Sequence, residues 1–192
     1  MEAYRYSNTA NRSVPTRRSY ALLMETLDLR RLRLRPGEVR HERLDVMLEP
    51  YLLGGQRYEA SPATIPAELE VTRPGGATML DLRVRARLVG PCMRCLGHAE
   101  VEAAATGREF HDPDARPGDE LRSDYVAEDQ LQVGAWARDA IALEIPEQVL
   151  CRPDCAGLCP VCGKDLNVEP HEHAEREADP RWAALAELKE TL

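Results

Sequence analysis

The sequence has few aromatic residues and no long apolar segment. Phe, Trp and Tyr together make up 5% of its 192 residues, while 43% are hydrophobic and 30% charged, a composition typical of a globular protein. No apolar run approaches the length of a membrane span. There is also no signal peptide with a positive start, an apolar middle and a small-residue cleavage site. We therefore expect a soluble, cytoplasmic protein without a membrane partner.

The motifs of the common enzyme classes are missing too. The sequence contains no P-loop, no G-x-G-x-x-G and no G-x-S-x-G. Two of its histidines, His171 and His173, follow a cysteine cluster and do not lie beside a nucleophile. The sequence thus predicts a protein that is not an enzyme and has no small-molecule substrate.

An excess of positive charge, common in proteins that coat nucleic acid, is absent. Lys and Arg number 25 against 33 Asp and Glu, a formal net charge of −8. The balance is uneven, because residues 1–57 carry 11 basic and 7 acidic side chains while residues 58–192 carry 14 and 26. Any contact with nucleic acid must therefore be local, or made through a protein partner.

Cysteines, by contrast, are conspicuously clustered. Four of the six lie within twelve residues in C-R-P-D-C-A-G-L-C-P-V-C, which begins at Cys151, and the other two form C-M-R-C at Cys92 and Cys95. A C-x2-C turn followed by a small residue can point two thiolates at one ion. This spacing indicates metal binding in a reducing compartment, where disulfides are rare.

The histidines can complete two sets of metal ligands. Six cysteines with His171 and His173 make eight ligands, the number that two tetrahedral zinc ions require. The spacing favours one set of Cys92, Cys95, Cys151 and Cys155 and a second set of Cys159, Cys162, His171 and His173. The alternative joins the two C-x2-C turns into one zinc ribbon and leaves a weaker second site. Closed four-ligand sites of either kind would be structural and would tie the end of the chain to its middle.

Two other kinds of cysteine chemistry form the alternative interpretation. Cys155, Cys159 and Cys162 match C-x3-C-x2-C, with which radical enzymes that use S-adenosylmethionine hold an iron–sulfur cluster. Such enzymes need a large barrel after the motif, and only 30 residues follow Cys162. Thiol-redox chemistry at Cys92 and Cys95 would normally be accompanied by a thioredoxin-like βαβ pattern, which does not surround this pair.

Alternating apolar residues predict antiparallel strands before the cysteine cluster. Short strands are expected at Leu32–Arg35, around 44–48 and at 67–72, with the rest of 50–77 in loops. The clearest strand runs from Thr78 to Val89. Its apolar face comprises Leu80, Leu82, Val84, Ala86 and Leu88, and its polar face Asp81, Arg83, Arg85 and Arg87. Arg83, Arg85 and Arg87 form an arginine stripe along this strand. Pairing of Leu88 with Ala99 across a hairpin would set Arg87 opposite Glu100 and Arg85 opposite Glu102, and these ion pairs would largely neutralise the stripe.

Two helices complete the predicted fold. One spans about 134–144 before Pro146, with an apolar face of Trp136, Ala137, Ala140, Ile141 and Leu143. The other follows Asp179-Pro180, with Trp182, Leu185, Leu188 and Leu192 on one face. The predicted class is α+β. A disordered tail over 1–23, with Met24 as a candidate start, precedes an antiparallel β-rich domain over 24–112 that carries the first cysteine pair. A helical, zinc-stapled C-terminal region over 113–192 packs on that domain.

The residues in this order resemble one protein family. G-P-C-M-R-C-L, a helix ending in A-L-E-I-P, then L-C-R-P-D-C-A-G-L-C-P-V-C-G-K-D-L-N and D-P-R-W-A-A-L look like the YceD family, the large ribosomal RNA subunit accumulation proteins. By this similarity the six cysteines match the family's cysteine positions. His171-Glu172-His173 stands where many relatives have a further C-x-C.

The resemblance implies a cytoplasmic, bacterial-type accessory factor in large-subunit ribosome biogenesis. Such a factor would support accumulation or processing of the large-subunit ribosomal RNA by binding that RNA, the pre-ribosome or a zinc-ribbon ribosomal protein. The most basic part of the chain and the predicted hairpin tip supply the candidate RNA contacts, which are Arg31, Arg33, Arg35 and Arg94.

Overall fold

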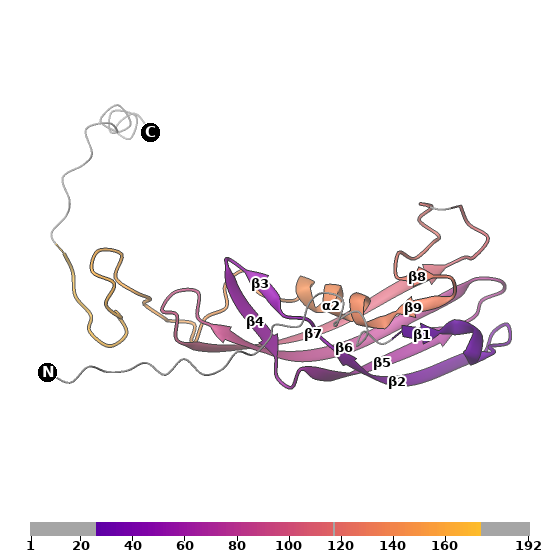
Figure 1. Cartoon of the computed structure of the whole chain (residues 1–192), viewed down its shortest axis with the longest axis horizontal. Coiled ribbons are helices and arrows are strands. Elements are labelled where there is room, and N and C mark those ends of the chain that lie inside the picture. Colours follow the sequence, from indigo (N-terminus) through magenta and orange to yellow (C-terminus); the bar gives the residue numbers. More distant parts are fainter. Residues whose placement is uncertain (1–25, 117, 174–192) are drawn as a thin grey trace, which may run out of the picture.

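A long antiparallel sheet dominates the protein (Figure 1). The computed structural model describes residues 26–116 and 118–173. The sheet contains β2 (Val39–Met47), β3 (Tyr51–Leu53), β4 (Gln56–Ala60), β5 (Thr64–Thr72), β6 (Thr78–Pro91) and β7 (His98–His111). Its order is β2-β5-β6-β4-β3, and β7 pairs with β6. Since β6 pairs with β4, β5 and β7, it is the central strand, and the predicted antiparallel β-rich fold is confirmed.

The remaining elements cover one face of this sheet. A small sheet has the order β1-β9-β8 and consists of β1 (Thr26–Asp28), β8 (Val126–Ala127) and β9 (Gln130–Gln132). The helix α2 (Val133–Leu143) follows β9 directly, and Figure 1 shows both on the same side of the large sheet. No element among the described residues covers the opposite face, which is therefore open to solvent.

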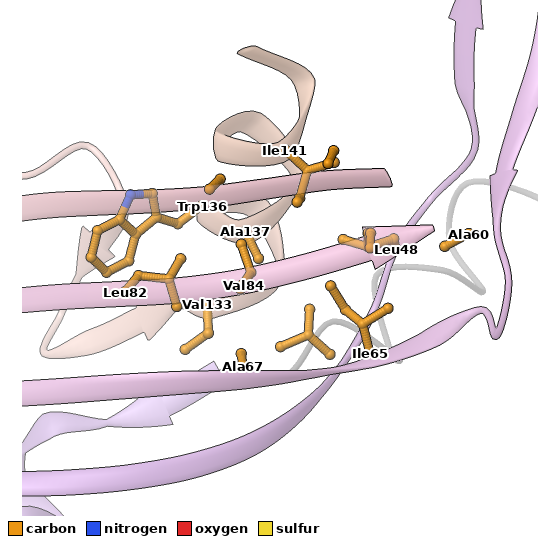
Figure 2. Packing of buried hydrophobic residues seen from close by; sticks show 14 of the residues in the cluster. Leu48, Ala60, Ile65, Ala67, Leu82, Val84, Val133, Trp136, Ala137 and Ile141 are labelled. Carbon is orange, nitrogen blue, oxygen red and sulfur yellow. The ribbon is translucent and has the colours of Figure 1, made fainter. Parts of the chain in front are cut away.

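The core lies between β6 and α2. As predicted, the apolar positions of β6 are buried, and Leu80, Leu82 and Leu88 are each at most 1% exposed. Figure 2 shows Leu82 and Val84 among Trp136, Ala137 and Ile141 of the helix. Burial of a Leu, Val or Ile side chain contributes about 1.5–3 kcal/mol. The helix thus shares one apolar core with the sheet.

One of the two predicted helices lies within the described residues. It forms as α2, with Trp136, Ala137 and Ile141 buried. The expectation that Leu143 lies on the packed face is wrong, because this side chain is 86% exposed. Leu143 follows Ile141 by two residues, about 200° of helical rotation, so it points away from the sheet. The second predicted helix, after Asp179-Pro180, lies outside the described residues, as does the predicted tail over 1–23.

Two segments differ from the predicted strands. The residues before Arg33 form a 3-10 helix, η1 (Leu29–Leu32), because the Asp28 side chain accepts a hydrogen bond from the backbone of Arg30 at 3.0 Å and caps the turn. Arg33 then adopts a left-handed conformation with φ 46°, so the chain does not continue as a strand. In the segment predicted as loops, β3 and β4 form a hairpin about Gly54 and Gly55, which take the positive φ angles that such a turn requires.

The hairpin of β6 and β7 has a different register from the one predicted. Leu88 pairs with Val101 and not with Ala99, a shift of two residues that leaves each side chain on its predicted face. The turn explains the shift, because the Cys92 N–H donates to the Gly97 carbonyl at 2.6 Å and so carries the pairing into the cysteine turn. The tip therefore contains more residues than a tight two-residue turn would.

Two cross-strand expectations change with this register. Glu102 now lies opposite Arg87, which nevertheless forms an ion pair with Glu100 at 3.4 Å across the diagonal. Arg85 lies opposite Ala104 and has no carboxylate across from it on β7. The predicted neutralisation of the arginine stripe is therefore right for Arg87 and wrong for Arg85.

Substitution of Gly107 in β7 should destabilise the packing of the helix on the sheet. A Cβ atom there would lie 2.7 Å from Trp136 Nε1 and 3.0 Å from two further ring atoms, and the buried ring has little room to move. We expect Gly107→Ala to lower the free energy of unfolding by about 1–3 kcal/mol in urea denaturation. Gly76→Ala is the control, because a Cβ there meets no atom within 4 Å. An equal decrease in the free energy of unfolding of both variants would contradict this explanation.

Candidate metal centre

The two C-x2-C segments fold into the same turn. In the first, the Leu96 N–H donates to the Cys92 carbonyl at 2.9 Å, and the Cys92 N–H donates to Gly97. In the second, the N–H of Gly163 donates to the Cys159 carbonyl at 2.8 Å, and the Cys159 N–H donates to Lys164 at 2.8 Å. Each turn needs a positive φ at its fifth residue. Gly163 adopts it readily at 74°, and Leu96 adopts it at 60°.

Four cysteines converge where the first turn meets the loop that follows α2. The sulfur atoms of Cys92, Cys95, Cys151 and Cys155 all lie within 4.8 Å of one another. Cys92 Sγ lies 3.8 Å from Cys155 Sγ, and Cys95 Sγ lies 3.6 Å from Cys151 Sγ. A tetrahedron with Zn–S bonds of about 2.3 Å has S–S edges of about 3.8 Å, whereas a disulfide is about 2.05 Å long. The spacing therefore fits a tetrahedral metal site, and all the cysteines are free.

The second turn contributes to another group of four. Cys159, Cys162, His171 and His173 have their ligand atoms within 4.8 Å of one another. His171 Nδ1 lies 2.7 Å from the Glu169 carbonyl, to which it can donate, and Nε2 then faces Cys162 Sγ at 3.1 Å. A backbone acceptor on the other ring nitrogen is the usual way in which a ligating histidine is oriented. This second group can thus hold a metal ion as well.

Burial and backbone hydrogen bonds set the charge of the thiols. Although burial raises the pKa of Cys92, backbone N–H groups of Cys95, Cys151 and Arg94 lower it to about 6. Backbone N–H groups of Cys162 and Val161 lower the pKa of Cys159 to about 6. Burial and then the neighbouring thiols raise the pKa of Cys151 to about 12. Each group therefore favours one thiolate, at Cys92 and at Cys159, and in the first group a further thiolate at Cys151 is opposed by burial and by its neighbouring thiols.

Arg94 joins the hairpin tip to the cysteine loop. Its guanidinium donates to the Cys155 carbonyl at 3.0 Å and to the Gln148 side chain at 3.1 Å. Its own carbonyl accepts from the N–H of Leu158 at 3.1 Å. Gly157 lies so close that a Cβ would be 3.2 Å from the Cβ and the carbonyl oxygen of Arg94. The structure gives Arg94 a structural role, and its predicted contact with RNA stays a prediction.

Asn167, which lies between the second C-x2-C turn and His171 in the chain, contacts the first group and was not anticipated from the sequence. Its side chain donates to Cys155 Sγ at 3.5 Å and accepts from the backbone of Ala156 and from Arg152, both at 2.8 Å. Such contacts orient ligands and offset the charge of thiolates. Its position soon after the second turn was the only available signal, because Arg152, Cys155 and Ala156 lie more than ten residues away in the chain.

The structure brings together all eight predicted ligands, in the division that the spacing favoured. The zinc-ribbon alternative would join Cys92 and Cys95 to Cys159 and Cys162, and these pairs lie in different groups. An iron–sulfur cluster on the C-x3-C-x2-C spacing would need Cys155 in the second group, whereas it lies in the first.

The other predicted RNA contacts, Arg31, Arg33 and Arg35, lie around η1 and are exposed. Arg31 forms an ion pair with Asp28 at 3.5 Å. In Figure 1 this segment and the cysteine loop, in indigo and yellow-orange, lie at opposite ends of the long sheet. The arginines and the cysteine groups therefore form two separate regions.

The fold and the site together define a class of protein. It is an antiparallel β-sheet protein with one α-helix among its described residues and two adjoining groups of possible metal ligands, one of four cysteines and one of two cysteines and two histidines. None of the described helices is long and apolar enough to span a membrane. Within this class the chain belongs to the YceD family, described as large ribosomal RNA subunit accumulation protein YceD, which it matches over residues 80–189. The match includes all eight residues of the two groups.

Relatives occur in bacteria and in a plant. The chain is 33% identical over 190 residues to the uncharacterized protein Rv2926c of Mycobacterium tuberculosis, covering 96% of this chain and 90% of that protein. It is 30% identical over 112 residues to YlbN of Bacillus subtilis, covering 56% and 64%. Over 140 residues it is 29% identical to the large ribosomal RNA subunit accumulation protein YCED homolog 1, chloroplastic, of Zea mays, covering 56% and 48%. No solved structure matches the chain.

Proposed function

We propose that the protein is a non-enzymatic accessory factor in biogenesis of the large ribosomal subunit and acts in the cytoplasm. Membership of the YceD family carries the proposal, together with the printed name of the maize relative. The factor would support accumulation or processing of large-subunit ribosomal RNA. Its partner would be this RNA in the pre-ribosome or a zinc-ribbon ribosomal protein of the large subunit, and it would have no small-molecule substrate.

Each of the two ligand groups would hold one structural zinc ion. The tetrahedral spacing of the sulfur atoms supports zinc in this role, as do the donor sets, which are four thiolates in one group and two thiolates with two imidazoles in the other. Four protein ligands would leave no open position for water or substrate, so neither ion would be catalytic. The first ion would fasten the cysteine loop to the hairpin tip, and the second would close the loop from Cys159 to His173.

The exposed arginines around η1 would contact ribosomal RNA. Arg31, Arg33 and Arg35 lie within five residues, and none of the described residues forms an ion pair with Arg33 or Arg35. Arg33 also ends η1 in a left-handed conformation at which an arginine is uncommon. A cluster of exposed guanidinium groups at one end of an otherwise acidic protein is a suitable local contact for phosphates.

Charge reversal at the three arginines tests this role. We expect Arg31→Glu/Arg33→Glu/Arg35→Glu to reduce co-sedimentation with large-subunit precursors by at least about tenfold, because each lost phosphate contact weakens binding and each new carboxylate repels the RNA. Arg40→Glu/Arg57→Glu/Arg116→Glu makes the same change in net charge at other exposed positions and should retain binding. Equal co-sedimentation of both triple variants and the unaltered protein would place the contact elsewhere.

A further inference from the structure

The open face of the large sheet carries many charged side chains, most of which are paired. Arg108 Nε lies 2.7 Å from Asp81 Oδ1, Arg87 forms its diagonal pair with Glu100, and Arg43 Nε lies 3.7 Å from Glu68 Oε1. Cross-strand pairs of this kind are the usual pattern of a solvated sheet face. A charged side chain on this face that forms no ion pair is therefore unusual.

Arg83 and Arg85, in the middle of β6, are two such side chains. Their partners in register on β7 are Thr106 and Ala104, which are uncharged. On the β5 side Arg83 is in register with Glu68, whose carboxylate lies within ion-pair distance of Arg43. No ion pair to Arg83 or Arg85 forms among the residues that the structure describes. Two exposed guanidinium groups thus lie on the same face of β6, and neither forms an ion pair with a described residue.

A shallow hollow of about 420 Å³ adjoins these two arginines. Its lining combines the arginines with side chains that are small or lack charge, chiefly Pro66, Ala104 and Thr106, and with Glu68. The short side chains of β7 leave the guanidinium groups uncovered, and Glu68 is offset by Arg43. The hollow is therefore locally positive, although the face as a whole is nearly balanced.

We propose that Arg83 and Arg85 bind two successive phosphates of single-stranded RNA, the backbone of which runs along β6 at this hollow. Residues two apart on a strand are separated by about 6.7 Å, comparable to successive phosphates in an extended strand. A guanidinium can bind a phosphate through two hydrogen bonds, and the small residues leave space for the sugars. The inference rests on the proposed role in ribosomal RNA assembly and adds a second contact to the one at η1.

The flanking ion pairs limit the size of this contact. A longer stretch of phosphates along β6 would meet Asp81 beyond Arg83 and Glu102 beyond Arg85, so only about two phosphates are accommodated. Binding of two phosphates has a measurable signature. For single strands the logarithm of the binding constant falls with the logarithm of salt concentration by about 0.7 per phosphate contact. Loss of both contacts should therefore lower the slope by about 1.4.

The test uses the full-length protein and a fluorescein-labelled twelve-nucleotide uridine RNA, followed by anisotropy at several salt concentrations. We expect Arg83→Gln/Arg85→Gln to reduce the salt slope by about 1.4 and to weaken binding at every salt concentration, and Arg83→Gln alone to reduce the slope by about 0.7. Arg87→Gln is the matched control on the same strand and face, and it should leave the slope unchanged because Arg87 is already paired with Glu100. Circular dichroism checks that each variant is folded.

The outcomes separate this inference from the proposed function. An unchanged slope and affinity for the double variant, with binding still lost on Arg31→Glu/Arg33→Glu/Arg35→Glu, would overturn the hollow as an RNA site and leave the function standing. Equal decreases of the salt slope and affinity in the double variant and in Arg87→Gln would also overturn it. They would show that any positive charge on the protein contributes equally, without a site at the hollow. If the unaltered protein bound neither this RNA nor large-subunit precursors, the proposed function itself would fail.

Discussion

Replacement of Cys155 by serine is expected to release the metal ion of the first group and to free the cysteine loop from the hairpin tip. Cys155 is 1% exposed and its sulfur lies among those of Cys92, Cys95 and Cys151. Loss of one thiolate would leave three ligands, and the sulfur atoms of Cys92, Cys95 and Cys151 would lose the proposed cation that offsets their repulsion. Structural zinc contributes on the order of 10 kcal/mol to the folding of such regions, so the effect should be large.

Hydrogen exchange followed by mass spectrometry measures this result. Amides of residues 92–97 and 149–167 should exchange at least about a hundredfold faster in Cys155→Ser, because the loop opens locally, whereas those in the centre of β6 should keep their protection. The sheet should survive, since Cys92 and Cys155 are the only ligands of the first group in the buried core, which otherwise consists mainly of apolar side chains such as Leu80, Leu82 and Ile141. One equivalent of metal should be lost.

The neighbouring residue supplies the control. Ala156 is exposed and contributes only its backbone N–H to Asn167, so Ala156→Ser should retain both the metal and the slow exchange. Slow exchange in Cys155→Ser with one equivalent of metal lost would show that hydrogen bonds of Arg94 and Asn167 hold the loop without the ion. Full retention of metal would show that the first group is not a metal site.

The double variant His171→Ala/His173→Ala should reduce the zinc content from two ions to one. The ligands of the second group all come from one short loop, in which Cys162 and His173 are exposed, so loss of the second ion should leave the first group intact. Inductively coupled plasma mass spectrometry of the purified proteins gives the stoichiometry, and urea denaturation should show little change in the unfolding of the sheet.

Another exposed histidine tests whether the effect is specific. His41 lies on β2, where it faces Glu70 at 3.5 Å, and His41→Ala should retain two zinc ions. A single zinc ion in the unaltered protein that persists in the double variant would leave both histidines as surface residues. Iron in place of zinc would overturn the proposed structural role and favour the iron–sulfur alternative.

Much of the fold follows from patterns of local sequence. The alternation of Leu80, Leu82 and Val84 with charged residues placed β6 and its buried face correctly, because a strand exposes successive side chains to opposite sides. The spacing of the cysteines likewise predicted the two C-x2-C pairs, since such a turn brings its own two sulfur atoms together. The strand faces and these pairs depend only on residues near one another in the chain.

Local patterns failed where distant contacts compete with them. The alternating residues at Leu32–Arg35 looked like a strand, but the 3-10 helix η1 ends at Leu32 and Arg33 is left-handed, and the ion pair of Arg30 with Asp129 at 3.0 Å ties η1 to the residues before β9. Leu143 has an apolar side chain at a helical position, and the direction of the sheet leaves it in solvent.

The sequence by itself determined the faces of the strands, the approximate extent of α2 and the two C-x2-C turns, because side-chain periodicity and turn spacing are local properties. The tertiary structure decided which cysteines share a group, since Cys92 and Cys155 meet only in the folded chain. The tertiary structure decided the register of β6 on β7, since the hydrogen bonds of the cysteine turn set which residues face each other. With that register it decided which arginines are paired, leaving Arg83 and Arg85 beside Thr106 and Ala104. Ion pairing depends on distances of a few ångströms between strands, which only the assembled sheet defines.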